Sequence, residues 1–367
     1  MRRAPSVTFV VMAGGRGERL WPLVRAAKPK VCCSPDGCRT LLQATIERLD
    51  GIWPNAGWLI VTTREQADAV GAALPLRLRR AVLIEPETKN TAACIALAAA
   101  VVAARRPKDV LVIVPADHWI RETAAFRRAV RAAIRAAVQE QAIVTIGIRP
   151  THPHPGFGYL CAGEPIRGSG SPPAFRLGRF VEKPSVGQAR RLLARGRTYW
   201  NSGIFIGAAE VFLERVTEWL PDHASQLAPF GAMIGVRAPS AGSRPGGLSR
   251  RLRAAYSRLP AVSFDHGVMD HLRNQGVVVE GRFSWADLGS WDAWARLGRA
   301  SSPAVAVESE HVTVIGQDGH LVATVGVRDL VIVHTPSATL VCRADRAQAV
   351  REVVRRLAGD PRLAAYR

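Results

Sequence analysis

Apolar residues in the first 150 positions alternate between short β-branched runs and longer stretches with a helical period. The short runs predict strands at 7–13, 58–62, 81–85, 110–114 and 142–148. The longer stretches predict helices at 40–49, 65–74, 90–105 and 123–140, and Asn90 is the expected N-cap of the third. Strands and helices in alternation are typical of βαβ units, so this part of the chain predicts a parallel sheet.

The pattern changes further along the chain. Residues 152–184 are rich in Gly and Pro with short strands, and the stretch up to 290 is expected to extend the same sheet before a last helix at 291–297. The Gly, Ser and Pro content of 231–247 predicts an exposed loop. After residue 302, short apolar runs predict five closely spaced strands, at 304–307, 312–315, 321–325, 330–333 and 339–342, without a strict sequence repeat.

These changes divide the chain into an α/β domain at 1–300 and a small β-rich domain at 301–367 that ends in a helix. Ala347, Val350, Val354 and Leu357 form the apolar stripe of that helix. Because the stripe needs a surface to cover it, we expect the second domain to pack against the first domain or a second subunit. It holds none of the candidate chemical groups described below, so we expect it to stabilise the protein without joining in the chemistry.

Composition excludes several classes of protein. With 48% hydrophobic and 22% charged residues in 367 positions, the chain is neither disordered nor collagen-like. Its net charge is +20, but the arginines are spread along the chain without a nucleic-acid motif, which favours a solvated basic surface over nucleic-acid binding. The apolar stretch 91–104 is shorter than the roughly 20 residues of a membrane span and predicts a buried amphipathic helix. Six cysteines without metal spacing or a preceding signal peptide indicate free thiols in the cytoplasm.

The strongest chemical signal follows the first predicted strand. Gly14, Gly15 and Gly17 come directly after it, with Arg19 and Lys30 further on. Glycines past the carboxyl end of a parallel strand let backbone N–H groups approach phosphate oxygens. A tight turn would use the same glycines, but the two neighbouring cations favour a phosphate site. The spacing fits neither a dinucleotide fingerprint nor a P-loop.

Two acidic residues are candidates for a metal site. Asp117 follows the predicted strand 110–114, where open α/β sheets bind ligands, and a carboxylate there suits Mg²⁺. Asp287, between Trp285 and Gly289, is the second candidate. Taken alone, each also fits a solvated loop residue.

The glycine segment, GGRGERLWPL at 14–23 with a following Pro-Lys at 29–30, resembles the signature of the sugar nucleotidyltransferases. Further segments in the same order are similar to the mannose-1-phosphate guanylyltransferase branch of that family; they lie at 85–92, 115–118, 156–159, 180–184, 200–205 and 285–291. The resemblance covers most of residues 7–360. It implies a Rossmann-like, doubly wound, mostly parallel α/β sheet with a β-helix-like C-terminal domain. It also implies transfer of GMP from GTP to mannose 1-phosphate, giving GDP-mannose and pyrophosphate by Mg²⁺-dependent in-line attack.

The resemblance assigns roles to individual residues. Arg19 and Lys30 would contact the triphosphate, Lys183 the attacking phosphate, and Asp117 with Asp287 the Mg²⁺ ion. The remaining expected substrate-binding residues are Gly14, Gly15, Gly17, Glu85, Asn90, Thr91, Gly158, Glu182 and Asn201. Glu182 could accept hydrogens from sugar hydroxyls, while the Asn201 amide both donates and accepts. No general base is expected, because the attacking phosphate is already largely deprotonated at neutral pH.

Alternatives stay open at this point. Within the enzyme class, another sugar 1-phosphate or another nucleoside triphosphate fits the same motifs. A catalytically silent, nucleotide-sensing homologue would keep the fold but lose charged residues. No nucleic acid or membrane partner is expected, and the sequence leaves a homodimer open.

Overall fold

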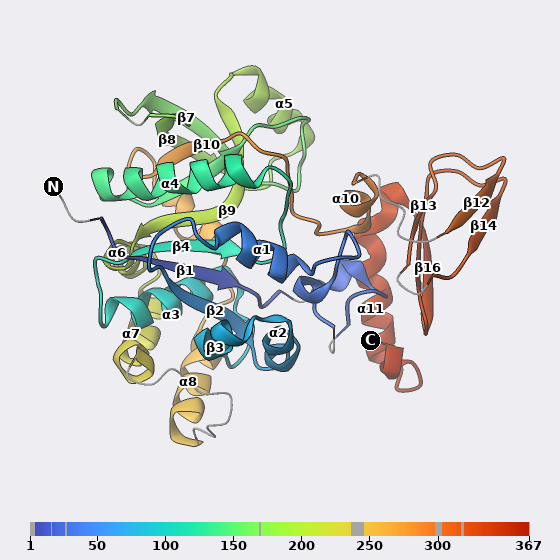
Figure 1. The fold of residues 1–367 in the computed structure, drawn as a ribbon, viewed down its shortest axis with the longest axis horizontal. Helices are drawn as coiled ribbons and strands as arrows, with labels where there is room; N and C mark the ends of the chain where they lie inside the picture. The colour runs from blue at the N-terminus through green and yellow to red at the C-terminus, as the bar shows by residue number, and fades with distance from the viewer. Residues whose placement is uncertain are drawn as a thin grey trace.

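A mixed β-sheet forms the centre of the first domain in the computed structural model, which describes residues 4–15, 17–25, 28–168, 170–235, 246–297, 303–316 and 319–366. Within these residues a nine-stranded sheet has the order β3-β2-β1-β4-β9-β6-β10-β8-β7 (Figure 1). The strands are β1 (Val7–Met12), β2 (Gly57–Thr63), β3 (Val82–Glu85), β4 (Val110–Pro115), β6 (Val144–Ile148), β7 (Tyr159–Pro165), β8 (Ala174–Val181), β9 (Thr198–Ala208) and β10 (Val277–Gly281).

Seven of the nine strands in the described sheet run in the same direction, and only β8 and β9 run opposite to them, which confirms a mostly parallel sheet with antiparallel pairs around these two strands. β1 pairs in parallel with both β2 and β4, β2 pairs in parallel with β3, and β10 pairs in parallel with β6. β9 is antiparallel to both of its neighbours, β4 and β6. The five strands expected in the first 150 residues all form, with ends within two residues of the predicted positions.

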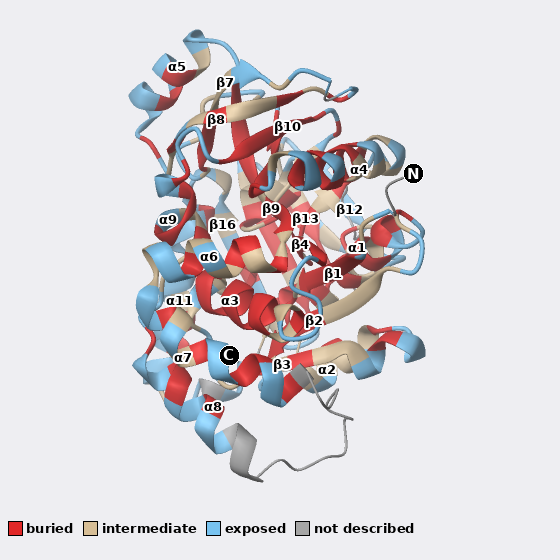
Figure 2. Ribbon diagram, turned by 90° about the vertical axis from the view of Figure 1, so that its left-hand side faces the viewer, coloured by how far each residue is buried: buried red, intermediate tan, exposed pale blue. Residues whose placement is uncertain are grey.

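Helices cover both faces of the sheet, as a doubly wound fold requires. The apolar cluster on one face includes α1 (Leu41–Leu49), α2 (Ala67–Ala73), α4 (Thr123–Glu140) and α5 (Val186–Ala194). The cluster on the other face includes α3 (Asn90–Ala103), α6 (Ala209–Trp219), α7 (Pro221–Gly235), α8 (Gly246–Arg258) and α9 (Phe264–Gly267). Figure 2 shows the buried residues concentrated along the strands and the inward sides of these helices.

Helix α3 differs from its expected form in two ways. It is buried on nearly all sides instead of being amphipathic, because α6 and α7 cover the side that faces away from the sheet. Asn90 is its first helical residue at φ 66° and not its N-cap, a position that Lys89 occupies. The Asn90 Oδ1 atom accepts a hydrogen bond from the adjacent Thr91 N–H at 2.8 Å. No helix among the described residues combines the length and apolar character needed to cross a bilayer.

The prediction of a loop at 231–247 is wrong at both ends of this range. Residues 231–235 complete α7 and residues 246–247 begin α8, while 236–245 lie outside the described residues. A Cβ atom on Gly231 would lie 2.3 Å from the carbonyl oxygen of Ala100. This glycine therefore allows close contact between α7 and α3, and does not mark a turn.

The C-terminal domain is a short β-helix that ends in an α-helix. Its elements are β12 (Ala304–Val307), β13 (Thr313–Ile315), β14 (Val322–Val325), β15 (Leu330–Thr335), β16 (Ala338–Arg343), the 3-10 segment η5 (Ala344–Ala349) and α11 (Val350–Gly359). Each residue of β12 pairs in parallel with the residue 18 positions later in β14, and β13 pairs with β15 at the same offset. Two stacked coils result, which confirms the β-helix-like expectation. The expected border between residues 300 and 301 lies outside the described residues.

A third apolar cluster joins the two domains. It contains Leu20 of the 3-10 segment η1 (Glu18–Leu20), Trp291 of α10 (Trp291–Ala295) and Val354 of α11. The indole N–H of Trp291 donates to the carbonyl oxygen of Trp21 at 3.0 Å. The C-terminal domain therefore packs against the first domain, as expected, and α11 lies beside the N-terminal loop segments (Figure 1).

Candidate active site

The glycine loop leaves the carboxyl end of β1 and passes over Lys30. Gly17 has φ 61°, and a Cβ atom there would lie 2.9 Å from Cβ of Lys30. A side chain at position 17 would therefore separate the loop from the 3-10 segment η2 (Lys30–Cys32). Gly15 is exposed, and no atom lies within 4 Å of the position its Cβ would take. The loop thus offers open backbone beside a buried cation.

Lys30 connects the two predicted metal ligands. Its ammonium is buried, with Nζ 2.7 Å from Oδ2 of Asp117 and 2.5 Å from the main-chain oxygen of Asp287. The chain brings these aspartates together through a short antiparallel pair, β5 (Trp119–Ile120) with β11 (Trp285–Ala286). An ammonium has three donors, so one donor of Lys30 remains for another acceptor.

Charge around Asp117 keeps this carboxyl ionised. Burial acts to raise the pKa of Asp117, but the attraction of Lys30 and the Lys30 hydrogen bond outweigh it, so its pKa lies below the ordinary value. The neighbouring His118 is buried, which lowers its pKa to about 4 despite the nearby carboxylate of Asp117. At neutral pH the site therefore combines an aspartate anion with an uncharged imidazole.

The donor atoms fit a Mg²⁺ ion bound together with phosphate. Asp117 and Asp287 supply hard carboxylate oxygens, and the Oδ1 atom of Asp287 is oriented by the Gly289 N–H at 3.1 Å. No group of three or more His, Cys, Asp and Glu side chains suited to a metal occurs in the described part of the chain. Two carboxylates leave most of the coordination to other ligands, which is how Mg²⁺ sites use water and substrate phosphates.

Arg19 lies in η1, between the glycine loop and the C-terminal domain. Its side chain is half-buried, and its Nε atom is buried without a hydrogen-bond partner in the described structure. The carboxylates of Asp287 and Asp292 attract it electrostatically. A guanidinium N–H left unpaired in a buried position is costly unless a ligand accepts from it.

The predicted sugar-binding residues form a second group. Gly158 and Asn201 are joined by a backbone hydrogen bond of 2.8 Å, and the Lys183 ammonium is ion-paired with Glu182. A Cβ atom on Gly158 would lie 2.8 Å from Oε2 of Glu182, so glycine allows the two segments to meet. Lys183 has φ 44° and an exposed side chain.

Asn201 has more protein partners than its expected role requires. Its amide oxygen accepts from the Thr145 hydroxyl at 3.0 Å and from the Gly203 N–H at 3.2 Å. Its amide nitrogen donates to Oδ1 of Asp265. Asn201 is therefore held in place, and it positions Asp265 in turn.

Asp265 is a residue that sequence reasoning missed. Burial and then the negative charge of Glu182 raise the pKa of Asp265 to about 6, although Asn201 and Lys183 oppose the rise. It lies in the first turn of α9, which the Ser263 side chain caps. An acidic residue in the first turn of a helix is ordinary, so nothing in the local sequence distinguishes it.

The Glu85 segment lies behind the glycine loop. Glu85 is buried, and the Tyr256 hydroxyl donates to its Oε1 atom at 3.0 Å. Burial raises the pKa of Glu85 to about 7 against the effect of that hydrogen bond. The Thr91 hydroxyl accepts from the Phe264 N–H at 2.8 Å. Thus Glu85 and Thr91 are engaged with the protein interior, whereas Asn90 is exposed.

Aromatic rings separate the metal-ligand group from the sugar-binding group. The ring of Phe157 lies 5.1 Å from that of Trp200 and 5.2 Å from that of Trp285, centroid to centroid. Trp200 precedes Asn201, and Trp285 comes two residues before Asp287. The two groups therefore flank one apolar wall.

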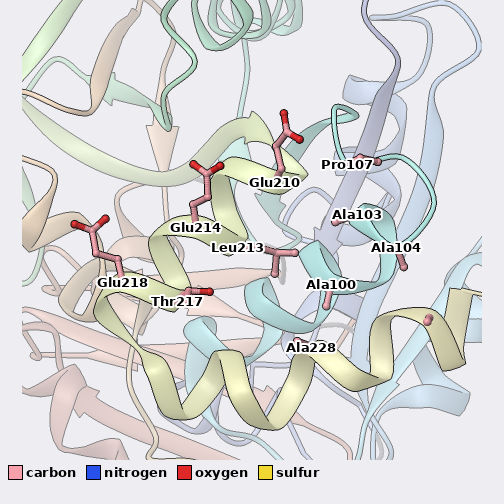
Figure 3. A pocket seen from close by; sticks show the side chains of 11 residues that line it. Ala100, Ala103, Ala104, Pro107, Glu210, Leu213, Glu214, Thr217, Glu218 and Ala228 are labelled. Atoms are coloured by element: carbon pink, nitrogen blue, oxygen red, sulfur yellow. The ribbon is translucent and has the colours of Figure 1, made fainter.

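A groove of about 740 Å³ between α3, α6 and α7 contains none of the expected site residues (Figure 3). Alanines form its floor, and Glu210, Glu214 and Glu218 project from α6 along one side. This acidic row would repel phosphate. The groove is therefore not the nucleotide site.

Comparisons with known proteins match both domains of the chain. The family model described as nucleotidyl transferase matches residues 8–302, and the model described as MannoseP isomerase/GMP-like beta-helix domain matches residues 302–357. A protein of Escherichia coli (strain K12) named mannose-1-phosphate guanylyltransferase is 34% identical over 363 residues, covering 96% of this chain and 74% of that protein. The xanthan biosynthesis protein XanB of Xanthomonas campestris pv. campestris (strain B100) is also 34% identical, over 94% of this chain and 72% of its own length.

A solved structure extends the comparison to three dimensions. A crystal structure from Thermus thermophilus, titled as that of a mannose-1-phosphate geranyltransferase, has a TM-score of 0.81 and 34% identity, covering 97% of this chain and 100% of that one. Sequence and fold therefore agree over both domains. The chain belongs to the nucleotidyl transferase family.

Proposed function

We propose that the chain transfers GMP from GTP to mannose 1-phosphate, forming GDP-mannose and pyrophosphate. The observation that carries the proposal is the convergence of Asp117, Asp287 and the Lys30 ammonium beneath an open glycine loop. The E. coli relative named for this activity supports the choice of substrates.

Different residues bind the triphosphate of GTP and the phosphate of the sugar. Arg19, Lys30 and the backbone of the glycine loop bind the triphosphate, whose terminal part leaves as pyrophosphate. Lys183 holds the phosphate of the attacking sugar. Because this oxygen is largely deprotonated at neutral pH, the protein has to orient it and neutralise charge, and no side chain has to remove a proton.

Asp117 and Asp287 would hold a Mg²⁺ ion. When bound, the ion supplies positive charge at the phosphates undergoing transfer. Lys30 contributes a fixed charge beside it and keeps the Asp117 segment against the Asp287 segment.

Sugar recognition is assigned to the group around Glu182. Glu182 and Asp265 are acceptors for sugar hydroxyls, and Asn201 fixes the orientation of Asp265. Phe157, Trp200 and Trp285 offer an apolar surface between the sugar and the metal ligands.

We also propose that the reaction takes place in the cytoplasm, without a nucleic acid or membrane partner. Six free cysteines support the compartment. Sedimentation of the purified protein tests the oligomeric state.

The test is pyrophosphate release across a grid of nucleoside triphosphates and sugar 1-phosphates with Mg²⁺ present. The expected result is a kcat/KM for GTP with mannose 1-phosphate at least about tenfold above that of other pairs, since a site built to hydrogen-bond its substrate rejects analogues. Turnover should stop when EDTA removes the metal.

Higher kcat/KM with another pair would replace the proposed substrates by that pair. GTP binding without pyrophosphate release from any pair would identify a nucleotide-sensing protein instead.

A further inference from the structure

The C-terminal helix reaches the segment that directly follows the glycine loop. Segment η1, which carries Arg19, contacts both α11 and η5. Leu20 of η1 and Val350 of α11 are buried in the same apolar cluster. The residue after Val350 is Arg351, in the first turn of α11, and its side chain is exposed.

Arg19 and Arg351 place two like charges near each other. Burial lowers the pKa of Arg19, and the positive charge of Arg351 lowers it further, against the pull of Asp287 and Asp292. The buried Nε atom of Arg19 has no acceptor in the described structure. Two guanidinium groups in this arrangement repel each other until an anion lies between them.

Arg351 also differs from the other arginines of its helix. Arg355 and Arg356 both pair with Glu352, at 3.3 Å and 3.5 Å. Arg351 has no ion pair or hydrogen bond within the described residues. Moreover, a cation in the first turn of a helix is opposed by the helix dipole. Its position is therefore unfavourable for the free protein, which a role in binding would explain.

We propose that Arg351 is a second guanidinium ligand of the substrate's polyphosphate, completing with Arg19 an anion site that spans the two domains. The inference rests on the proposed function for the identity of the anion, which is the triphosphate end of the nucleotide and then inorganic pyrophosphate. It differs from the expectation that the C-terminal domain takes no part in the chemistry. Guanidinium groups suit this role because they form paired hydrogen bonds to phosphate oxygens.

The test uses inorganic pyrophosphate as the probe, with and without Mg²⁺, on the full chain. Arg351→Gln should weaken pyrophosphate binding in calorimetry about tenfold, and raise KM for GTP by a similar factor, because one charge-assisted contact is lost. KM for mannose 1-phosphate should stay within about twofold. Arg351→Lys should restore part of the affinity through charge alone.

Arg356→Gln is the matched control. It removes an equally exposed arginine from the same helix, one that already has a carboxylate partner, and should leave pyrophosphate and GTP binding unchanged. Folding is checked by the thermal midpoint without ligand, which should not fall in Arg351→Gln because the repulsion on Arg19 is relieved. Added pyrophosphate should raise that midpoint less in Arg351→Gln than in the wild type.

Equal pyrophosphate affinity in Arg351→Gln and Arg356→Gln would overturn the proposal, even if the wild type forms GDP-mannose. Conversely, weaker pyrophosphate binding in Arg351→Gln alone would support it, even if the grid of substrates showed no turnover. A failure of the Arg351 proposal can therefore be distinguished from a failure of the proposed function.

Discussion

Lys30 contributes both to the stability of the fold and to the candidate site. Substitutions of its two partners, Asp117 and Asp287, can separate these contributions. Asp117→Asn removes the carboxylate that pairs with this buried ammonium, whereas Asp287 contacts Lys30 through its main-chain oxygen. We expect both Asp117→Asn and Asp287→Asn to lower kcat about 100-fold or more, because each removes one of two anionic metal ligands. We expect only Asp117→Asn to cost about 2 kcal/mol of unfolding free energy as well, since it leaves a buried charge unpaired.

Pyrophosphate release and urea unfolding measure the two effects. Asp222→Asn, an exposed change in the first turn of α7, serves as the control and should alter neither. Near-normal turnover of Asp287→Asn at limiting Mg²⁺ would remove Asp287 from the metal site. Equal stability of the two variants would contradict the structural role given to the Lys30–Asp117 pair.

The placement of residues that follow strand ends was the predictable part of the candidate site. The glycines, Arg19 and Asp117 lie after strands β1 and β4, as expected, while their roles in binding stay predictions. Asp265 could not be found in this way, because its environment comes from Asn201 and Glu182, which are distant in the chain. The hydrogen bonds of Asn201 could not be predicted either, because the sequence around an Asn does not show which distant residues its side chain contacts.

Gly158, just before β7, packs closely against side chains at the end of β8. Gly158→Ala would place Cβ 2.8 Å from both Cζ of Phe180 and Oε2 of Glu182, which displaces the proposed hydroxyl acceptor. KM for mannose 1-phosphate should rise about tenfold, while KM for GTP stays within about twofold, since a clash of this size shifts neighbours locally.

Gly187→Ala in α5 is the matched control, because no atom lies within 4 Å of its Cβ position. That variant should keep wild-type kinetics and gain slightly in stability from the improved helix propensity. Equal increases of both KM values in Gly158→Ala would show instead that the substitution disturbs the whole site.

Elements were predictable where local pattern and tertiary environment agree. Four strands in the first 150 residues, β1, β2, β4 and β6, lie inside the sheet, so a continuous β-branched run was sufficient to find them. The last residues of α7 were predicted as part of a loop, because Gly231 is there for contact with Ala100 and local sequence does not reveal this packing. The 18-residue offset between β12 and β14 could not be predicted, because the paired positions hold different residues, such as Ala304 opposite Val322. The pairing therefore leaves no repeat in the sequence.

The two domains share too much buried surface to behave independently. Leu20, Trp291 and Val354 belong to one apolar cluster that contains residues of η1, α10 and α11. We therefore expect a single cooperative thermal transition for both domains, with equal calorimetric and van't Hoff enthalpies. Leu357→Ala, at the far end of this cluster, should lower stability by about 2–4 kcal/mol while keeping the transition single.

Differential scanning calorimetry checks this expectation. Leu363→Ala, in the exposed segment after α11, is the control and should change the midpoint little. Two resolved transitions, or loss of only the lower one in Leu357→Ala, would mean that the domains fold separately.

The contacts of η1 and Trp21 with the C-terminal domain also order events during protein synthesis. The indole N–H of Trp21 donates to the carbonyl oxygen of Tyr366, which is 345 residues later in the chain. The ribosome therefore releases η1 long before α11, which packs against it. A nascent chain can form β1 and its neighbours early, yet η1 reaches its final packing only when α11 has emerged.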